Sequence, residues 1–137
     1  IVLLGMMFVP TALADEKVET AYRQAVMKSV GGHMGAMAGI AKNGVHMEDI
    51  GVHARGMAAL ADLAPDVFAA DTQSEKSKAM DAIWEDPEAF SMAMDKFVVA
   101  AKNMPAAADT GDRAQIGQAM QALGGSCKGC HDDFKEE

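Results

Sequence analysis

The strongest constraint on the fold is one apolar stripe near the carboxyl end of the chain. Six side chains recur there at alternating steps of four and three residues: Ile116, Met120, Leu123, Cys127, Cys130 and Phe134. Positions spaced in this way share one face of an α-helix, which repeats about every 3.6 residues. The segment that begins near Gly111 and Asp112 is therefore predicted to be a helix. Its apolar face, including both cysteines, is expected to point into a core.

Three more amphipathic helices are predicted upstream. Apolar residues follow helical spacing over about residues 16–42, 47–63 and 87–104, and a short helical turn is predicted over 78–84. No segment shows the alternating pattern of a β-strand. Four amphipathic helices with mostly short connections pack most simply as an antiparallel four-helix bundle, so the predicted fold class is all-α.

Glycine and proline mark the expected helix ends. Asn43-Gly44 is typical of a helix C-terminus, and Pro65 follows the end of the second helix. Pro87 suits the first position of the third helix, where its missing N–H costs nothing. Pro105 is expected to end or kink that helix, because proline removes a backbone hydrogen bond.

Composition indicates a globular domain and excludes several partners. Hydrophobic residues make up 50% of the chain and charged residues 23%, which argues against a disordered polyelectrolyte. The net charge is −8 and no basic cluster occurs, so neither nucleic acid nor an anionic membrane surface is an expected partner. Only 5% of residues are aromatic, whereas twelve are Met. The core is therefore expected to contain bulk other than aromatic side chains.

The first fourteen residues differ from the rest. Residues 1–10 form an uncharged apolar run, and Thr11-Ala12-Leu13-Ala14 follows before Asp15. An apolar stretch of about ten residues ending in an Ala-x-Ala site is typical of a secretory signal peptide, and it is too short to span a bilayer. We predict a signal peptide over residues 1–14, truncated at its N-terminus and cleaved after Ala14. The exported domain is then 15–137, with no membrane span; the alternative is a buried N-terminal helix.

The motif that carries chemistry is Cys127-Lys128-Gly129-Cys130-His131. Cysteines three residues apart on a helix point the same way, and the histidine that follows can turn its imidazole toward the same space. This spacing suits two thioether bonds to the vinyl groups of a haem, with the imidazole as an axial iron ligand. The sequence therefore predicts one covalently bound haem c inside the bundle, held by Cys127, Cys130 and His131.

Two other uses of the cysteines stay open at this point. Cysteine pairs in exported proteins often form disulfides. A structural zinc site normally takes four ligands, and His33, His46 or His53 would have to supply the one that the motif lacks. Otherwise we expect His33 to be packed or at the solvent edge and the other two at the surface. No Ser-His-Asp arrangement, phosphate loop or paired-carboxylate site occurs, so the chain is not expected to be an enzyme.

Three short motifs give the chain a resemblance to a known family. They are Tyr22-Arg23-Gln24-x-x-Met27, Ile83-Trp84-x-Asp86-x-x-x-Phe90 and Cys127-Lys128-x-Cys130-His131-Asp132-x-Phe134. In this order and spacing the chain resembles the class II cytochromes c, which include cytochrome c′ and its low-spin six-coordinate relatives. The resemblance covers essentially all of residues 15–137. It implies a haem-c four-helix bundle in a Gram-negative periplasm, often a homodimer packed through its first two helices.

The resemblance also implies roles for individual residues. Cys127 and Cys130 would be the thioether links, and His131 would be the proximal iron ligand. Arg23 and Gln24 match positions that lie near the haem propionates in the family. A guanidinium paired with a carboxylate is physically sensible there.

Met27 matches the distal position of the family, where the residue decides the chemistry. In some relatives this residue is a non-bonding apolar cap, and the iron stays five-coordinate and open to small gases. In others a Met sulfur is the sixth ligand, which raises the reduction potential and suits electron transfer. Our main interpretation is an electron carrier that serves redox partner proteins, with His131 and Met27 as candidate ligands. The alternative is a five-coordinate cytochrome c′ that binds nitric oxide or carbon monoxide, and Met27 is then simply a core residue.

Overall fold

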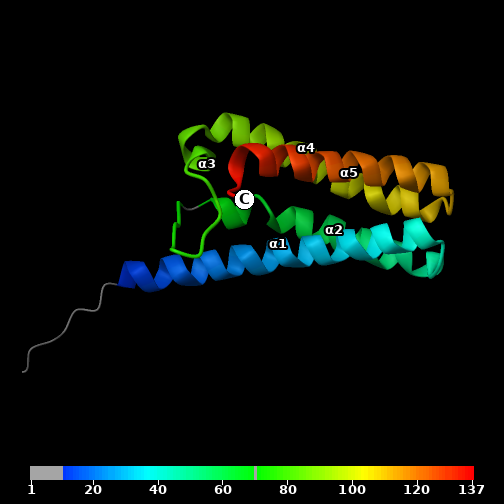
Figure 1. Ribbon diagram of the computed structural model, residues 1–137, viewed down its shortest axis with the longest axis horizontal. Helices are drawn as coiled ribbons and strands as arrows, with labels where there is room; N and C mark the ends of the chain where they lie inside the picture. Colours follow the sequence, from blue (N-terminus) through cyan, green and yellow to red (C-terminus); the bar gives the residue numbers. More distant parts are fainter. Residues whose placement is uncertain (1–10, 70) are drawn as a thin grey trace, which may run out of the picture.

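The computed structural model describes residues 11–69 and 71–137, and most of them are helical (Figure 1). The five helices are α1 (Thr11–Asn43), α2 (Ile50–Leu63), α3 (Ala82–Glu85), α4 (Pro87–Asp109) and α5 (Arg113–Phe134). Two single turns of 3-10 helix, η1 (Met47–Asp49) and η2 (Asp66–Phe68), flank α2. The four long helices confirm the predicted all-α bundle.

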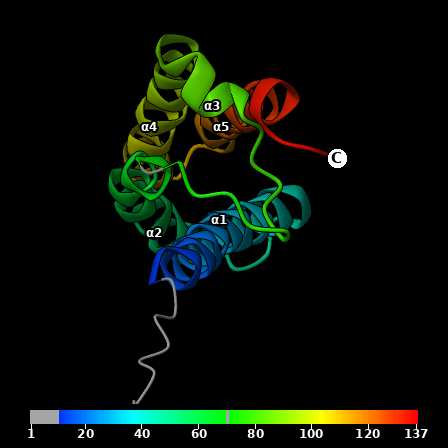
Figure 2. The same cartoon turned by 90° about the vertical axis from the view of Figure 1, so that its left-hand side faces the viewer.

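The four long helices form two layers. Figure 1 shows α1 beside α2 in one layer and α4 beside α5 in the other, and the end-on view in Figure 2 places the four at the corners of the bundle. α2 packs extensively on α4, and α4 on α5, whereas α1 touches α5 at few points. The side of the bundle between α1 and α5 is therefore the loosely packed one.

Aspartates begin the two helices of the second layer. The side chain of Asp86 accepts a hydrogen bond from the backbone N–H of Ala89, and that of Asp112 accepts from Ala114 and Gln115. These bonds satisfy N–H groups that have no partner within the helix. They also lower the pKa of Asp112, the bond from Gln115 first, because they favour the charged carboxylate. The predicted starts of both helices are confirmed.

Two predicted boundaries need correction. α4 continues through Pro105 to Asp109, so the expectation that this proline ends the helix is wrong. Met104 and Ala108 flank it and are both buried, and their packing keeps the last turn helical although proline supplies no N–H. The second helix starts later than predicted, because residues 47–49 form the separate turn η1.

Most of the predicted signal peptide lies outside the described residues. Residues 1–10 are not described, and α1 begins at Thr11, inside the remaining part. Cleavage after Ala14 therefore stays a prediction. Among the residues that the structure describes, no helix combines the length and hydropathy needed to cross a membrane.

Methionine fills much of the core, as the composition suggested. The largest fully buried side chains are Met37, Met57, Met104, Ile116 and Leu123, and they come from all four long helices. The stripe on α5 is buried unevenly. Ile116, Leu123 and Phe134 are buried, whereas Met120 and both cysteines are only half-buried. The prediction that the cysteines face a closed core is thus only partly right, since they lie where the packing opens.

Candidate functional site

A large apolar cavity lies on the loosely packed side of the bundle. Its volume is about 670 Å³, and its walls come from α1, η2, α3, α4 and α5 and from the connection between η2 and α3. The residues that matter for chemistry are Met27, Met34, Phe90, Cys127, Cys130 and His131. A cavity of this size, lined mainly by hydrophobic side chains, is typical of a cofactor site.

The wall on α5 carries the predicted attachment motif. Cys127, Cys130 and His131 all line the cavity, from the last turns of the helix. Both thiols are free, and burial is the main reason that the pKa of each is raised. A zinc site needs thiolates, which burial disfavours. None of the three other histidines reaches this wall, so the fourth zinc ligand that the sequence left open is not supplied.

The imidazole of His131 is suited to bind iron. Burial lowers its pKa, the positive charge of Lys135 lowers it further, and Asp132 opposes both effects. The neutral form that results is the one with a free lone pair for a metal. The donor set of two thiols and one neutral imidazole at the wall of an apolar cavity therefore fits a covalently attached haem.

The wall on α1 lies on the other side of the cavity. Met27 is half-buried there and packs against the core, and Val30 and Met34 continue the wall toward the C-terminus of the helix. Gly31 and Gly35 also line it, and a Cβ atom added at either position would have no atom of another part of the chain within 4 Å. From Met27 to Gly35 the cavity side of this wall is thus apolar, apart from Lys28.

The contacts of the Arg23 side chain were not predicted from the sequence. Its side chain is 3% exposed, and its guanidinium lies over the rings of Phe68 and Trp84, at 5.4 and 5.7 Å from their centres. Nη1 donates to Thr72 Oγ1 at 3.1 Å, and Nη2 donates to the Thr72 carbonyl at 2.8 Å and to Ser77 Oγ at 3.2 Å. Burial lowers its pKa, whereas nearby carboxylates raise it. Arg23 thus fastens the connection between η2 and α3 to α1.

Gln24 also forms a hydrogen bond to the connection between η2 and α3. Its exposed side chain donates from Nε2 to the carbonyl of Lys76 at 2.6 Å. Arg23 and Gln24 both line the cavity, as the resemblance implied, but the hydrogen bonds that the structure shows for them go to the connection. Their contact with haem propionates therefore stays a prediction.

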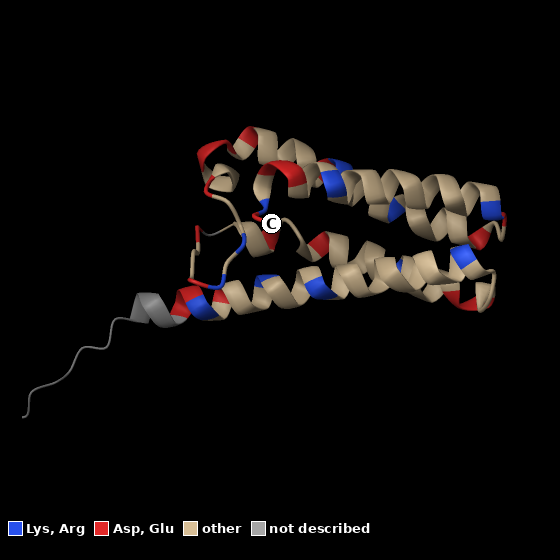
Figure 3. Ribbon diagram, viewed as in Figure 1, with Lys and Arg blue, Asp and Glu red and all other residues tan. Residues whose placement is uncertain are grey.

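Three lysines line the cavity, and two of them, Lys28 and Lys78, were not predicted from the sequence. Lys28 of α1, Lys78 of the connection and Lys135 after α5 all line it, and Figure 3 shows blue segments on these three parts of the chain. They are far apart in the sequence and form no basic cluster there. In a chain of net charge −8 they place positive charge at the cavity, where an ammonium group could pair with a carboxylate of a bound haem.

Backbone bonds join the connection to the end of α5. The N–H of Glu136 donates to the carbonyl of Lys78 at 2.9 Å, and the N–H of Met80 donates to that of Phe134 at 3.0 Å. The Lys78 ammonium also donates to the Glu137 carbonyl at 2.7 Å. One edge of the cavity is thereby held to both α1 and α5.

A sequence profile described as cytochrome C′ matches residues 19–135. The chain belongs to the cytochrome c′ family. Cytochrome c′ of Rhodospirillum rubrum is 37% identical over 131 residues, which cover 90% of this chain and 86% of that protein. The predicted family is thereby confirmed, and so is the predicted cofactor, because proteins of this family carry one covalently attached haem c.

Solved structures of cytochrome c′ share the fold. The crystal structure of the protein from Rubrivivax gelatinosus has a TM-score of 0.80 and 34% identity, covering 86% of this chain and 94% of that one. The nitric oxide complex of a single-residue mutant of the Alcaligenes xylosoxidans protein has a TM-score of 0.81 and 26% identity, covering 89% and 97%. These similarities favour haem over a disulfide or zinc at Cys127 and Cys130.

The remaining histidines lie outside this site. His46 is exposed next to η1, as expected. His33 and His53 are half-buried, and their Nδ1 atoms lie only 3.1 Å apart. The expected surface position of His53 is therefore wrong. Its pairing with His33 was not predicted, because the two histidines are 20 residues apart on different helices.

Proposed function

We propose that this cytochrome c′ binds nitric oxide or carbon monoxide at the distal face of its haem, next to Met27. The observation that carries the proposal is the apolar wall of α1 on the other side of the cavity from His131. The nitric oxide complex of a relative with the same fold supports it. The proposed role is ligand binding, without catalysis.

The chain's own residues each have a part in this function. Cys127 and Cys130 would hold the haem through thioether bonds, and His131 would bind its iron, since all three side chains line the cavity. When bound, the haem supplies an iron that takes small diatomic ligands and changes its charge by one electron. The apolar wall of α1 admits neutral diatomic molecules and disfavours charged ones, because it has little to compensate their lost hydration.

Met27 distinguishes this function from the main interpretation of the sequence. Its side chain packs against the core residues of the bundle, which is what a non-bonding cap requires. It also lines the cavity, so a sulfur ligand and electron transfer to a redox partner protein form the competing hypothesis. The two hypotheses differ in the spin state of the iron.

An absorption spectrum of the haem-loaded protein tests the proposal. We expect a high-spin spectrum in both oxidation states and rapid binding of carbon monoxide by the reduced protein. Met27→Leu should leave the spin state unchanged, as should the control Met34→Leu on the same wall. A low-spin spectrum with a sulfur-to-iron band that Met27→Leu alone abolishes would contradict the proposal and establish Met27 as the sixth ligand.

We further propose that the protein works in the periplasm as a homodimer. The predicted signal peptide supports export, and N-terminal sequencing of the mature protein should begin at Asp15. Val18 and Tyr22 of α1 and Val52 of α2 are more than half exposed and offer apolar surface for a second copy. Sedimentation should give a dimer that Val52→Glu dissociates. A wild-type monomer at high concentration would refute this assembly.

A further inference from the structure

α1 and α2 bring two histidines into direct contact outside the haem cavity. The Nδ1 atoms of His33 and His53 lie 3.1 Å apart, and the ring planes are inclined by 60°. Both side chains are half-buried, so the two helices hold the rings while solvent can still reach them. Without a metal, the Nδ1–H of one ring donates to the Nδ1 lone pair of the other.

The backbone of α2 makes room for this pair. A Cβ atom at Gly56 would lie 2.5 Å from Cε1 and 2.6 Å from Nε2 of His33, which is closer than real atoms approach. Any residue other than glycine would therefore push the His33 ring away from its present position. The contact between the two imidazoles depends on a glycine three residues after His53.

We propose that His33 and His53 form a binding site for a divalent late first-row metal ion, of which Cu²⁺ binds most tightly. Imidazole nitrogen is a preferred ligand of Ni²⁺, Cu²⁺ and Zn²⁺. The affinity of a given site for these ions is highest for Cu²⁺. The site is separate from the haem cavity, because neither histidine lines that cavity.

The distance between the two nitrogens suits a shared ion. With metal–nitrogen bonds of about 2.05 Å, nitrogens 3.1 Å apart subtend about 98° at the metal, between the square-planar and tetrahedral angles. The ring that donates in the hydrogen bond must first move its proton from Nδ1 to Nε2, which leaves the total number of protons unchanged. Each Nδ1 then offers a lone pair to the ion.

Water completes the coordination shell of the proposed site. Within the described part of the chain, no third His, Cys, Asp or Glu side chain lies close enough to join the two rings as a ligand. The half-buried position leaves the open side of the ion accessible to water. Two helix-borne imidazoles with open positions differ from a closed structural zinc site, which has four protein ligands.

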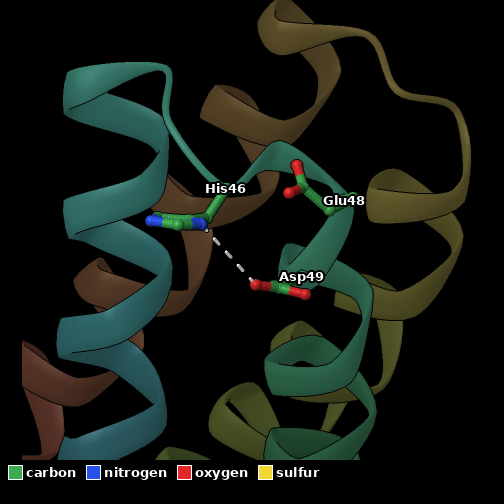
Figure 4. Close-up of side chains that lie close together, drawn as sticks. All are labelled: His46, Glu48 and Asp49. Carbon is green, nitrogen blue, oxygen red and sulfur yellow. Dashed lines mark ion pairs between the residues drawn. The ribbon is translucent and has the colours of Figure 1, made fainter.

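A different group of side chains provides an internal comparison. His46, Glu48 and Asp49 lie near one another at η1, and Figure 4 shows them projecting from the turn that leads into α2. All three are exposed, and the side chains of His46 and Asp49 are 71% and 58% exposed. The exposed histidine of this cluster, His46, serves as the control for weak metal binding by a surface imidazole.

Calorimetric titration of the oxidised, haem-loaded protein with Cu²⁺ alone tests the proposal. We expect one ion per chain, and His33→Ala and His53→Ala should each abolish this binding. His46→Ala should leave it unchanged. Electron paramagnetic resonance of the bound copper should show two nitrogen ligands in the wild type. Binding that survives both single variants, or that disappears in His46→Ala, would overturn the proposal.

Gly56→Ala tests the geometry without removing a ligand. The added methyl group displaces the His33 ring, so we expect affinity to fall at least about tenfold, as when other supporting residues of metal sites are changed. The haem absorbance and helical circular dichroism should be unchanged, because alanine is favourable within a helix. Wild-type affinity in a folded Gly56→Ala protein would show that the observed contact does not form the site.

Discussion

Nη2 of Arg23 in α1 donates a 2.8 Å hydrogen bond to the carbonyl oxygen of Thr72, which lies 49 residues further along the chain. This bond fastens the connection between η2 and α3 over one edge of the haem cavity. Ser77 Oγ accepts a second bond from the same nitrogen. The residue that family resemblance placed beside the haem thus also determines the shape of the cavity.

Removing the Arg23 guanidinium should destabilise the protein. Arg23→Met keeps much of the packing on Phe68 and Trp84 but removes the donors to Thr72 and Ser77. Because half-buried acceptors on Thr72 and Ser77 lose their bonds from a charged donor, we expect the free energy of unfolding to fall by about 1–3 kcal/mol. Urea denaturation of the haem-loaded protein measures this.

Gln24→Met is the matched control for that experiment. The Gln24 side chain is exposed and donates a hydrogen bond to the Lys76 carbonyl, so its loss should cost less than about 1 kcal/mol. Equal losses in the Arg23 and Gln24 variants would show that the Arg23 bonds add nothing beyond those of an exposed side chain.

Replacing the glycines on either side of the start of α5 by alanine should change the stability of the protein in opposite directions. Gly111 has a φ of +65°, where a side chain is strained, and Gly111→Ala should destabilise the protein by about 1 kcal/mol. Gly117 lies within α5 with open space around it, so Gly117→Ala should stabilise by about 0.5–1 kcal/mol. Thermal unfolding compares the two variants, and a stabilising Gly111→Ala would contradict the strained conformation.

Variants of the haem-binding residues should distinguish covalent attachment of the haem from coordination of its iron. His131→Ala should keep haem on the polypeptide in denaturing electrophoresis, because Cys127 and Cys130 form the thioether links, but its absorption spectrum should change. Cys127→Ala combined with Cys130→Ala should lose haem under the same conditions. Retention of haem by the double cysteine variant would refute covalent attachment at these positions.

The chain without haem should be less ordered than the haem-loaded protein. The cavity of about 670 Å³ has apolar walls from five helical elements, and without the ring these walls lose their packing partner. We expect a lower melting temperature and a weaker near-ultraviolet circular dichroism signal in the double cysteine variant. Identical melting curves would show that the bundle does not depend on the ring.

Stability should depend on pH through Asp112. The folded-state pKa of this carboxyl is lowered by bonds from Gln115 and Ala114, so its contribution is complete above the ordinary value of 3.8. It disappears as the pH falls through the lower folded-state pKa. Asp112→Ala should therefore destabilise at pH 7, and the difference from wild type should shrink in acid. Asp112→Asn has no titrating group at this position, so its difference from wild type should shrink in acid by the same amount. A difference between wild type and either variant that stays constant into acid would contradict this origin.

Local signals were readable from the sequence because they depend on neighbours along the chain. The stripe on α5 predicted a helix, and its predicted start at Gly111 and Asp112 agrees with the observed cap. The Cys127-x-x-Cys130-His131 spacing predicted the haem before any tertiary contact was known. Pro105 shows the limit of this reasoning, because the burial of Met104 and Ala108 outweighs the local preference of proline.

The sequence by itself indicated the helices and the family, and it predicted that Cys127, Cys130 and His131 hold the haem. Only the tertiary structure decided what surrounds them. The cavity is lined by three lysines from different parts of the chain, Lys28, Lys78 and Lys135. His33 contacts His53 across two helices. No pattern along the chain indicates either arrangement. Helical periodicity fixes which face of a helix is buried. The contacts between faces depend on how the helices pack against one another, and that is set by the side chains of the whole core together.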